Sequence, residues 1–338
     1  MELTVKPKLE DVARAAGVST ATVSRCLNEP GKVTEKTREK VLRTVETLGY
    51  TPNFGGRALA SRRTYTVGAV IPTMENAIFA RGLQAFQEAL AEDGITLLVA
   101  SSGYDTRQEE AQIRALVSRG ADGILLIGTA RSRGATDFLR RLAIPYVIAW
   151  SISDPNETCV GFDNVAAARM IAERVIALGH RKIAMISGLT AMNDRASGRV
   201  QGVRMALADA GLDIDGFRVE ESKYAFDAAG SAFECLMKSA DSPTAVICGN
   251  DVLGVGAIAK ARALGLRVPE DVSITGFDDI DVSAIIDPPL TTVHVPHQRM
   301  GVAAAKALLG LIDNQSVDRV QEIETMIVER GSLGPPPS

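Results

Sequence analysis

The feature that most constrains the fold is an alternation, from Thr66 onward, of apolar strand-like runs with helical stretches of about a dozen residues. The apolar runs are TVGAVI, ITLLVA, GILLIG, PYVIAW, KIAMIS, TAVICG and VSITGF. The helical stretches include 79–93, 105–119, 164–178, 197–211, 226–239 and 251–264. This order predicts α/β architecture, with parallel, doubly wound sheets built from right-handed crossovers. The pattern is too long for one flavodoxin-sized unit, so two similar lobes are expected.

The first 60 residues differ, because they predict a small all-α unit of short helices. Apolar residues recur at i, i+3, i+4 and i+7 from Leu9, and Gly17 ends that helix. Ser19 is a favourable N-cap for a second helix, and Thr34 is one for a third helix that Gly49 ends.

The spacing of the first two helices meets the packing needs of a helix-turn-helix. Counting Leu9 as position one, the small residue Ala13 falls at position five and Gly17 falls at the turn, position nine. Apolar or small residues fill the other interior positions: Val12, Ala16, Val18, Val23 and Cys26. The second helix would then enter the major groove of DNA with its N-terminal residues at the base edges. An ordinary helical hairpin is the alternative.

The charge is divided unevenly along the chain. Residues 1–63 contain 12 Lys and Arg against 7 Asp and Glu, a net charge of +5. The remainder contains 25 against 34, a net charge of −9. A basic head on an acidic body fits a polyanion-binding module joined to one that binds no polyanion, although charge alone does not exclude a chance fluctuation.

Composition argues against membrane and disulfide-rich classes. Apolar residues make up 46% and charged residues 23%, and no apolar run is long enough to span a bilayer. The N-terminal sequence lacks the apolar core of a signal peptide. Four scattered cysteines without CxxC spacing or neighbouring His indicate thiols in a reducing compartment: Cys26, Cys159, Cys235 and Cys248. We expect a cytoplasmic protein with no metal, no other cofactor and no membrane partner.

Residues 9–64, LEDVARAAGVSTATVSRCLNEPGKVTEKTREKVLRTVETLGYTPNFGGRALASRRT, resemble the DNA-binding head and hinge of the lactose/galactose repressor (LacI/GalR) family without a gap. By position, the resemblance implies that Thr20 and Ala21 discriminate bases and that Arg25 reads a guanine through O6 and N7. It implies phosphate contacts or helix capping for Ser19, Thr22, Asn28 and Thr34.

The same resemblance extends into the hinge. Tyr50 and Asn53 match positions that anchor the hinge to the DNA backbone, and Leu59 matches a leucine that wedges into the minor groove and kinks the duplex. Gly55 and Gly56 replace the usual small apolar residues, and each costs a helix about 1 kcal/mol relative to alanine. We therefore expect a hinge helix that is ordered only on the operator.

The body resembles the periplasmic-binding-protein-like core of the same family. The supporting segments are VGFDN (160–164), ALGHRKIAMISG (177–188), NDRASGRVQGVRMAL (193–207), CGNDVLGVGAI (248–258), VPEDVSITGFDD (268–279) and PPLTTVHVP (288–296). The organisation implied is a helix-turn-helix head at 1–52, a hinge helix and linker at 53–64, an effector-binding and dimerisation body at 65–330, and a disordered tail at 331–338. Within the body, the N-lobe covers about 65–163 and 293–320, and the C-lobe about 164–290 and 321–330.

Ligands of doubly wound sheets bind beyond the carboxyl ends of the strands. The resemblance implies that Arg199 grips the effector and that Asp278 accepts its hydroxyls or amines, with Asn250 beside it. Phe79 begins the first crossover helix, where an aromatic ring packs on the ligand, and Ser102 lies at the end of a predicted strand.

Trp150, the only tryptophan, either stacks on a ligand ring or packs in the core, and Tyr224 and Phe226 are further candidates for the cleft wall. One guanidinium fork and one carboxylate in an apolar cleft suit a sugar, a sugar acid or a nucleobase-like ligand. The segments SSGYD (101–105) and VPHQRMG (295–301) are similar to gluconate-responsive members, which favours a sugar acid.

The partners expected are therefore a double-stranded DNA operator, a small-molecule effector and a second copy of the chain. One head reads few base pairs, so a homodimer on a pseudo-palindromic operator is expected. The chain shows no terminal leucine heptad, which argues against a tetramer. A repressor is the favoured reading; activation stays open, as does the choice between inducer and corepressor.

Two other classes are disfavoured. An enzyme on this scaffold would need a site, and the sequence has no GxxxxGK[ST], GxGxxG or GxSxG motif, so no catalytic residue is proposed. A secreted solute-binding protein would share the two lobes, but the absent export signal and the basic head argue against it.

Overall fold

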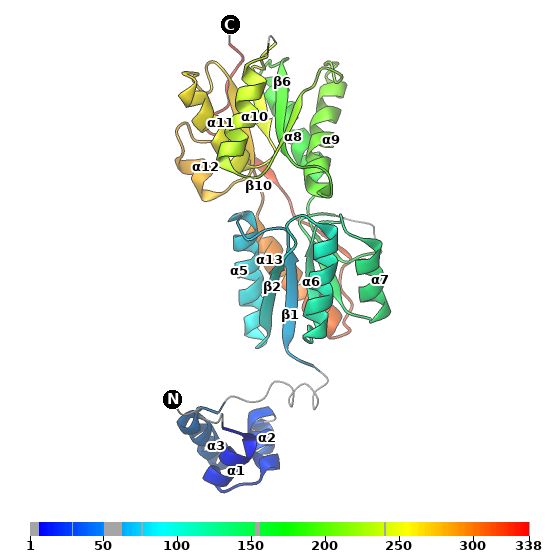
Figure 1. Cartoon of the computed structure of the whole chain (residues 1–338), viewed down its shortest axis with the longest axis vertical. Coiled ribbons are helices and arrows are strands. Elements are labelled where there is room, and N and C mark those ends of the chain that lie inside the picture. Colours follow the sequence, from blue (N-terminus) through cyan, green and yellow to red (C-terminus); the bar gives the residue numbers. More distant parts are fainter. Residues whose placement is uncertain are drawn as a thin grey trace. The chain divides into compact units, whose positions relative to one another are not determined.

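A computed structural model describes residues 7–28, 30–50, 63–75, 77–152, 156–239 and 241–337. The contacts within the chain divide it into two units, Met1–Thr64 and Tyr65–Ser338 (Figure 1). Asn53, Leu59 and the two hinge glycines lie outside the described residues, so the predictions made for them stay predictions. Within the described ranges, no helix is long and apolar enough to cross a bilayer.

The first unit is helical, as predicted, with α1 Leu9–Ala16, α2 Thr20–Asn28, the 3₁₀ turn η1 Pro30–Lys32 and α3 Glu35–Leu48. Gly17 and Gly49 end α1 and α3 with left-handed φ values of 63° and 62°. At the start of α1, the backbone N–H of Lys8 donates to Oδ2 of Asp11 at 2.9 Å. The predicted interior of the helix-turn-helix forms the core of this unit, which comprises Val12, Ala13, Ala16, Val23, Cys26, Val41 and Tyr50.

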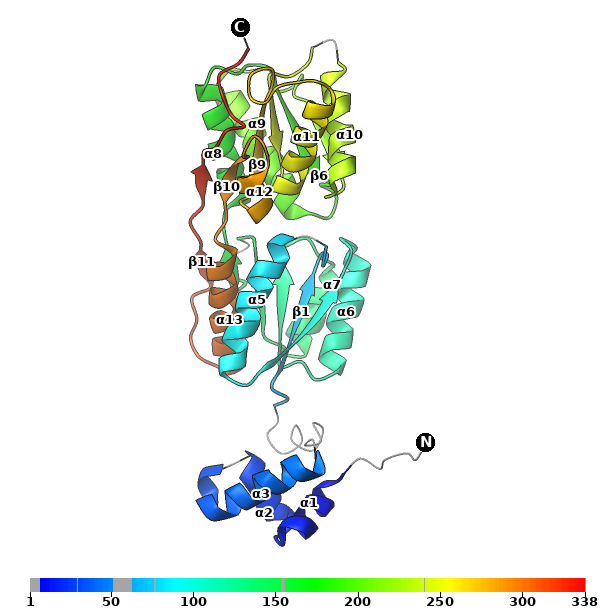
Figure 2. The same ribbon diagram turned by 90° about the vertical axis from the view of Figure 1, so that its left-hand side faces the viewer.

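The second unit contains two α/β lobes. The N-lobe sheet has the strand order β11-β5-β4-β3-β1-β2, and each of these pairings is parallel. Its strands are β1 Thr66–Ile71, β2 Thr96–Ser101, β3 Gly123–Ile127, β4 Tyr146–Ala149, β5 Cys159–Gly161 and β11 Val320–Glu322. One face carries α5 Ala77–Glu92 and α13 His297–Ile312; the other carries α6 Thr106–Ser118 and α7 Arg133–Arg141 (Figure 2).

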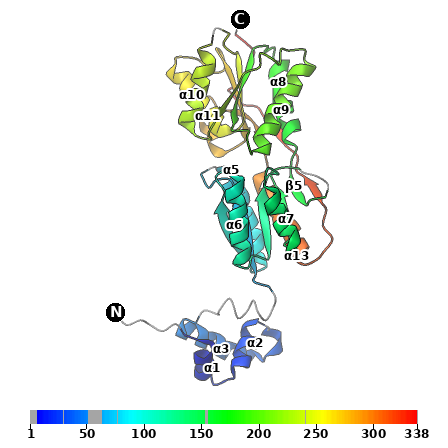
Figure 3. The ribbon, with the colours of Figure 1, turned by 45° about the vertical axis from the view of Figure 1, so that its right-hand side comes forward.

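The C-lobe sheet repeats this plan with the order β12-β10-β9-β8-β6-β7, in which only the β10–β12 pairing is antiparallel. Its strands are β6 Ile183–Gly188, β7 Val219–Ser222, β8 Ala245–Cys248, β9 Ser273–Asp278, β10 Thr291–His294 and β12 Met326–Val328. One face carries α8 Asn164–Ala177 and α9 Asp194–Asp209; the other carries α10 Phe226–Met237 and α11 Asp251–Ala263 (Figure 3). The short helix α12, Asp281–Ile285, follows β9.

The chain passes between the lobes three times: after β5, after β10 and after β11. The last two crossings differ slightly from the predicted lobe boundaries. Strand β10 stays in the C-lobe through His294, because it pairs with β9, and β11 stays in the N-lobe through Glu322, because it pairs with β5.

The expectation of a disordered tail from residue 331 is wrong for the described residues 331–337. Ser332 is fully buried against the C-lobe, where its Oγ accepts from the backbone N–H of Thr291 at 2.9 Å and donates to the carbonyl of Ile274 at 2.6 Å. The carbonyl of Gly334 accepts from Nε2 of the buried His180 at 2.8 Å. The tail therefore completes hydrogen bonds at the amino ends of β9 and β10, two interior strands of the C-lobe sheet.

Candidate DNA-binding helix and effector site

Helix α2 has an exposed polar side opposite the side chains that it buries. Val23 and Cys26 lie in the core of the head, whereas Thr20, Ala21 and Arg25 are exposed. Ala21 and Arg25 are four residues apart and so lie on one side of the helix. A hydroxyl, a methyl group and a guanidinium fork are the groups that contact base edges in the major groove.

The predicted N-cap residues, Ser19 and Thr34, directly precede the first residues of α2 and α3. Oγ of Ser19 accepts from the backbone N–H of Thr22 at 3.1 Å, which confirms Ser19 as the cap of α2. Thr34 occupies the N-cap position of α3, but its Oγ1 lies 2.9 Å from Oγ1 of Thr37 and makes no hydrogen bond to the helix backbone. Asn28 is the last residue of α2. Exposed hydroxyls at helix N-termini suit phosphate oxygens.

Tyr50 follows α3 and is largely buried. Its ring belongs to the core of the head, and its backbone N–H donates to the carbonyl of Val45 at 3.0 Å. The ring therefore has a packing role, and the predicted contact of Tyr50 with the DNA backbone stays a prediction for its hydroxyl.

In the body, Arg199 on α9 has a buried guanidinium held in one orientation. Its Nε donates to Oδ1 of Asn164 at 3.0 Å, and its Nη1 donates to the carbonyl of Gly249 at 2.6 Å. The guanidinium carbon lies 3.7 Å from the centroid of the Phe277 ring, a buried cation–π contact. Nη2 lies 3.6 Å from Oδ1 of Asp278.

Asp278 ends β9 as a fully buried carboxylate with a left-handed φ of 102°. Within the described residues, neither of its carboxylate oxygens has a hydrogen-bond partner. Burial raises the pKa of its carboxyl from 3.8 to about 6, although Arg199 and Arg195 act in the opposite direction. A buried carboxylate with strained backbone and no hydrogen-bond donor lowers the stability of the fold, and such residues concentrate at ligand sites. A ligand hydroxyl or amine would supply the missing donor.

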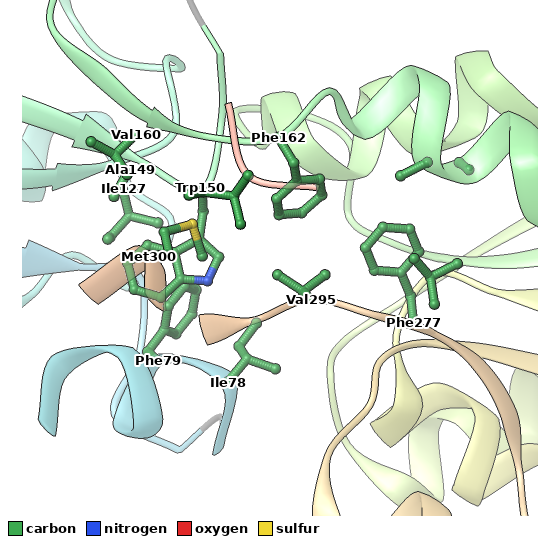
Figure 4. Close-up of a cluster of buried hydrophobic side chains, with 14 of the residues drawn as sticks. Ile78, Phe79, Ile127, Ala149, Trp150, Val160, Phe162, Phe277, Val295 and Met300 are labelled. Atoms are coloured by element: carbon green, nitrogen blue, oxygen red, sulfur yellow. The ribbon is translucent and has the colours of Figure 1, made fainter. Parts of the chain in front are cut away.

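Trp150 lies at the junction of the lobes, close to Phe79 and Met300 (Figure 4). The Phe79 ring meets the indole edge-on, with 5.8 Å between centroids, and both side chains are 1% exposed. The indole N–H donates to Nδ1 of His297 at 3.0 Å. Of the two roles left open for Trp150, core packing is therefore the one that this arrangement favours, and His297 lies between the indole and Asp278.

His297 was missed by the analysis of the sequence as a site residue. Its Nε2 lies 4.0 Å from Oδ1 of Asp278 and has no hydrogen-bond partner in the part of the chain that the structure describes. Burial lowers the pKa of its imidazole to about 3. Asn164, which orients Arg199, was also missed as a site residue, although it lies in the quoted VGFDN segment.

Asn250 places a further unsatisfied group next to Gly249. Its Oδ1 accepts from the backbone N–H of Leu253 at 2.9 Å and caps α11, while its Nδ2 is buried without a partner among the described residues. The carboxylate of Asp251, the next residue, accepts hydrogen bonds from Oγ1 of Thr292 at 2.5 Å and from the backbone N–H of Ile280 at 2.8 Å. Burial nevertheless raises the pKa of Asp251 to about 8.

Ser102 lies in a separate, small polar cavity at the carboxyl ends of β1, β2 and β3. The cavity has a volume of about 20 Å³, room for roughly one water molecule. Glu109 from α6 and Arg195 from α9 also line it, and Oε2 of Glu109 has no partner within the described ranges. Burial raises the pKa of Glu109. The structure thus brings Phe79, Trp150, Arg199, Asn250 and Asp278 toward one centre and places Ser102 in this neighbouring cavity.

Two larger pockets open beside Tyr224, with volumes of about 610 Å³ and 330 Å³. Tyr224 lines both, and Phe226, which is 52% exposed, lines the larger one. Glu75 of the N-lobe also contributes to both. Both pockets are lined by segments of the two lobes. Asn193 lines the smaller one, and its Nδ2 donates to the Tyr224 hydroxyl at 3.2 Å.

Comparison with known proteins covers both units. Residues 8–53 match the family described as "Bacterial regulatory proteins, lacI family", and residues 172–333 match the "Periplasmic binding protein-like domain". The ribose operon repressor of Haemophilus influenzae is 31% identical over 327 residues, which cover 96% of this chain and 98% of that protein. The solved structure of a LacI-family regulator from Silicibacter pomeroyi is 25% identical with a TM-score of 0.88, covering 97% and 99% of the two chains. A CelR–cellobiose complex is 32% identical with a TM-score of 0.71, covering 97% and 100%.

These similarities confirm the predicted fold class, a helix-turn-helix head followed by a periplasmic-binding-protein-like body. They also confirm the class of function, because relatives aligned over nearly the whole chain are transcriptional regulators and repressors rather than enzymes. This chain belongs to the LacI family of bacterial DNA-binding transcriptional regulators.

Proposed function

We propose that this protein is a transcriptional repressor that binds a pseudo-palindromic operator as a homodimer and responds to a sugar or a sugar acid bound in its body. The observation that carries the proposal is the buried group around Asp278, where carboxylate, imidazole and amide atoms lack partners within the described residues. Such a group suits a ligand rich in hydroxyls, because each hydroxyl both donates and accepts.

On the DNA side, two copies of the head place two α2 helices about one helical turn apart in the major groove. Thr20, Ala21 and Arg25 contact bases. Other residues contact the DNA backbone and fix the position of the head along the duplex: Ser19, Thr22, Asn28, Thr34, Tyr50 and Asn53. Leu59 enters the minor groove at the centre of the operator. Because its target is the DNA of a bacterium, the protein acts in the cytoplasm.

On the effector side, Asp278 and Asn250 bind hydroxyls, Arg199 balances the charge of Asp278, and Phe79 supplies apolar contact. The names of two relatives, the ribose operon repressor and CelR in complex with cellobiose, support sugar chemistry. The proposal of a sugar acid is supported by the segments 101–105 and 295–301, which resemble those of gluconate-responsive members of the family.

The experiment is a thermal-shift screen of sugars and sugar acids, followed by anisotropy measurements on DNA selected from genomic fragments. A compound that raises the melting temperature and also changes DNA affinity supports the proposal. An increase in affinity identifies a corepressor and a decrease identifies an inducer. If no sugar and no sugar acid shifts the melting temperature, the effector assignment fails.

A further inference from the structure

We infer that His297, oriented by Trp150, determines the specificity of the effector site: His297 and Asp278 form a donor–acceptor pair that binds an alcohol hydroxyl and excludes a carboxylate at that point. The inference rests on the proposed function, since it concerns the same site. It adds a role for His297, which lies in the quoted VPHQRMG segment but was not assigned to the site from the sequence, and a chemical requirement on the ligand.

The hydrogen bond from Trp150 fixes the tautomer of His297. An indole N–H only donates, so Nδ1 of His297, 3.0 Å away, must accept. Burial lowers the pKa of the imidazole to about 3, which makes the ring neutral near pH 7. A neutral imidazole carries one proton, so that proton lies on Nε2. His297 therefore presents a donor on the side of Asp278.

The distance between the two side chains leaves both unsatisfied. Nε2 of His297 and Oδ1 of Asp278 are 4.0 Å apart, beyond the range of a direct hydrogen bond. Neither atom has a hydrogen-bond partner of good geometry within the described residues, although the backbone of Asp278 also interacts with the imidazole and raises its pKa against the larger effect of burial. Both side chains are buried, at 2% and 0% exposure. A donor and an acceptor at this separation can share one hydroxyl oxygen that lies beside the line joining them, at ordinary hydrogen-bond distances from both.

Only some functional groups meet that requirement. An alcohol oxygen accepts from Nε2–H and donates its own proton to Oδ1 of Asp278. A carboxylate only accepts, so it would bind beside Asp278 only after Asp278 had taken up a proton, which costs free energy at a pH above the Asp278 pKa of about 6. An ammonium group only donates, which leaves Nε2–H of His297 unpaired.

Arg199 does not change this preference. Its Nε and Nη1 already donate to Asn164 and to the carbonyl of Gly249, and the third nitrogen, Nη2, faces Asp278. The positive charge of Arg199 thus offsets only part of the cost of burying the Asp278 charge. Arg195 also lowers the pKa of Asp278, but its Nη1 is paired with Oδ1 of Asp194 at 3.0 Å. An anionic ligand group at this position would therefore add negative charge to a buried site whose guanidinium groups already face carboxylates.

The position of Trp150 is itself fixed by its surroundings. A Cβ atom added to Gly82 on α5 would lie 2.4 Å from the indole ring, so only glycine allows the ring to occupy this place. A Cβ atom on Gly301 of α13 would lie 2.1 Å from the carbonyl of Gly82, so the two helices cross closely there. Nδ2 of Asn164 donates to the carbonyl of Trp150 at 3.1 Å. Trp150 is thus a positioning residue that acts through His297.

The test begins with D-ribose, cellobiose and D-gluconate in calorimetric titrations of the full-length protein, widened to other aldoses and aldonic acids. The tightest compound is then compared with its deoxy analogues, position by position, on the wild type and on His297→Phe. At one hydroxyl, we expect the deoxy change to weaken binding about tenfold in the wild type and clearly less in His297→Phe, where only the bond to Asp278 remains to be lost. His297→Gln, which keeps a side-chain N–H donor, should restore most of the discrimination.

Trp150→Phe tests the positioning role with a different readout. In the wild type, ¹⁵N spectra of the labelled histidines should show His297 neutral with its proton on Nε2. In Trp150→Phe, the signal of the Nδ1–H tautomer should appear, and binding should weaken. Met300→Leu, in the same apolar cluster, is the matched control and should leave both readouts unchanged.

The outcomes separate the two claims. If none of the compounds binds the wild type, the proposed effector class fails and this inference fails with it. If one binds and His297→Phe shows the same loss for every deoxy analogue as the wild type, the inference is overturned while the proposed function stands. A wild-type spectrum with the proton on Nδ1 overturns it too.

Discussion

Nη2 of Arg199 lies 3.6 Å from Oδ1 of Asp278, close enough for attraction between charges but beyond hydrogen-bonding distance. The guanidinium is instead tied to Asn164 and Gly249, so the carboxylate keeps its lone pairs unpaired within the described residues. The protein thus holds a buried charge that its own side chains do not fully compensate. This arrangement lowers stability in the absence of ligand and favours recognition.

Replacing Asp278 with Asn should stabilise the protein without effector and abolish the effector response. Burial raises the pKa of Asp278 from 3.8 to about 6, so the fold favours its protonated form. Stability from that form is present below the unfolded pKa and is lost as the pH rises through about 6. Asp278→Asn should therefore raise the unfolding free energy at pH 7 by up to roughly 3 kcal/mol, measured by urea denaturation.

The gain from Asp278→Asn should shrink as the pH falls from 7 to 5, because the wild-type carboxyl becomes protonated over that interval. Asp287→Asn is the matched control, since Asp287 is exposed and pairs with Arg262 at the surface. That change should alter stability by less than about 1 kcal/mol. A destabilised Asp278→Asn protein at pH 7 would contradict the interpretation of the site.

Binding of a neutral sugar should weaken in acid. The ionised form of Asp278 is the better acceptor for hydroxyl protons, and its pKa of about 6 places the change below neutral pH. The dissociation constant should rise by up to about tenfold for each pH unit below that value and level off above pH 7. Calorimetry between pH 5 and 8 measures this. An affinity that is constant over that range would argue against a ligand contact with Asp278.

Arg25→Ala should remove sequence discrimination on DNA while leaving effector binding unchanged. Arg25 is exposed on α2, and loss of a bidentate guanine contact costs about 1–3 kcal/mol of discrimination. Competition anisotropy with selected and scrambled DNA measures the ratio. Arg43→Ala on α3, at a side chain that is 79% exposed, is the control and should retain the wild-type ratio. Equal losses in both variants would show that charge rather than base contact acts at position 25.

Asp194→Ala should loosen the contact between the lobes. Its carboxylate accepts from Oγ of Ser151 at 2.8 Å and from the N–H of Ala130 at 3.4 Å, which joins the start of α9 to the N-lobe. Loss of these bonds should accelerate effector dissociation about tenfold in stopped-flow measurements. Asp209→Ala, at the exposed end of the same helix, should dissociate at the wild-type rate. Unchanged dissociation in Asp194→Ala would show that these bonds do not hold the lobes together on the effector.

Deleting residues 331–338 should destabilise the body. The deletion removes the hydrogen bonds that Ser332 and Gly334 make with the C-lobe, among them the two side-chain bonds of Ser332 and the bond from His180 to Gly334, a loss of about 2–4 kcal/mol in unfolding free energy. A shorter deletion after Gly334 keeps these bonds and should unfold like the full-length protein. Equal stability of the two truncated proteins would mean that the tail contacts contribute nothing.

The elements of the body follow from local patterns, which explains why they could be predicted. An apolar run such as TVGAVI is buried along its whole length in β1, and the same holds for the run that forms β3. Arg199 and Asp278 could be named because the family segments in which they occur are local. The ends of α1 and α3 could be predicted for the same reason, because Gly17 and Gly49 follow the last residues of these helices.

Contacts between distant parts of the chain could not be predicted in this way. Nothing near His297 indicates that an indole 147 residues away fixes its proton. The buried state of Ser332 depends on pairing with Ile274 and Thr291, while its own surroundings of glycine and proline suggest a loose end. Both features arise from packing across the fold, which a local pattern does not report.

The most direct test of the central claim is fluorescence anisotropy of the full-length protein on its selected operator, with and without the sugar or sugar acid that raises its melting temperature. Operator affinity should change by about 5- to 150-fold when the compound is bound. That change should disappear in Asp278→Asn, while Arg25→Ala should lose the operator yet still bind the compound. An operator affinity that is the same with and without the bound compound would contradict the account.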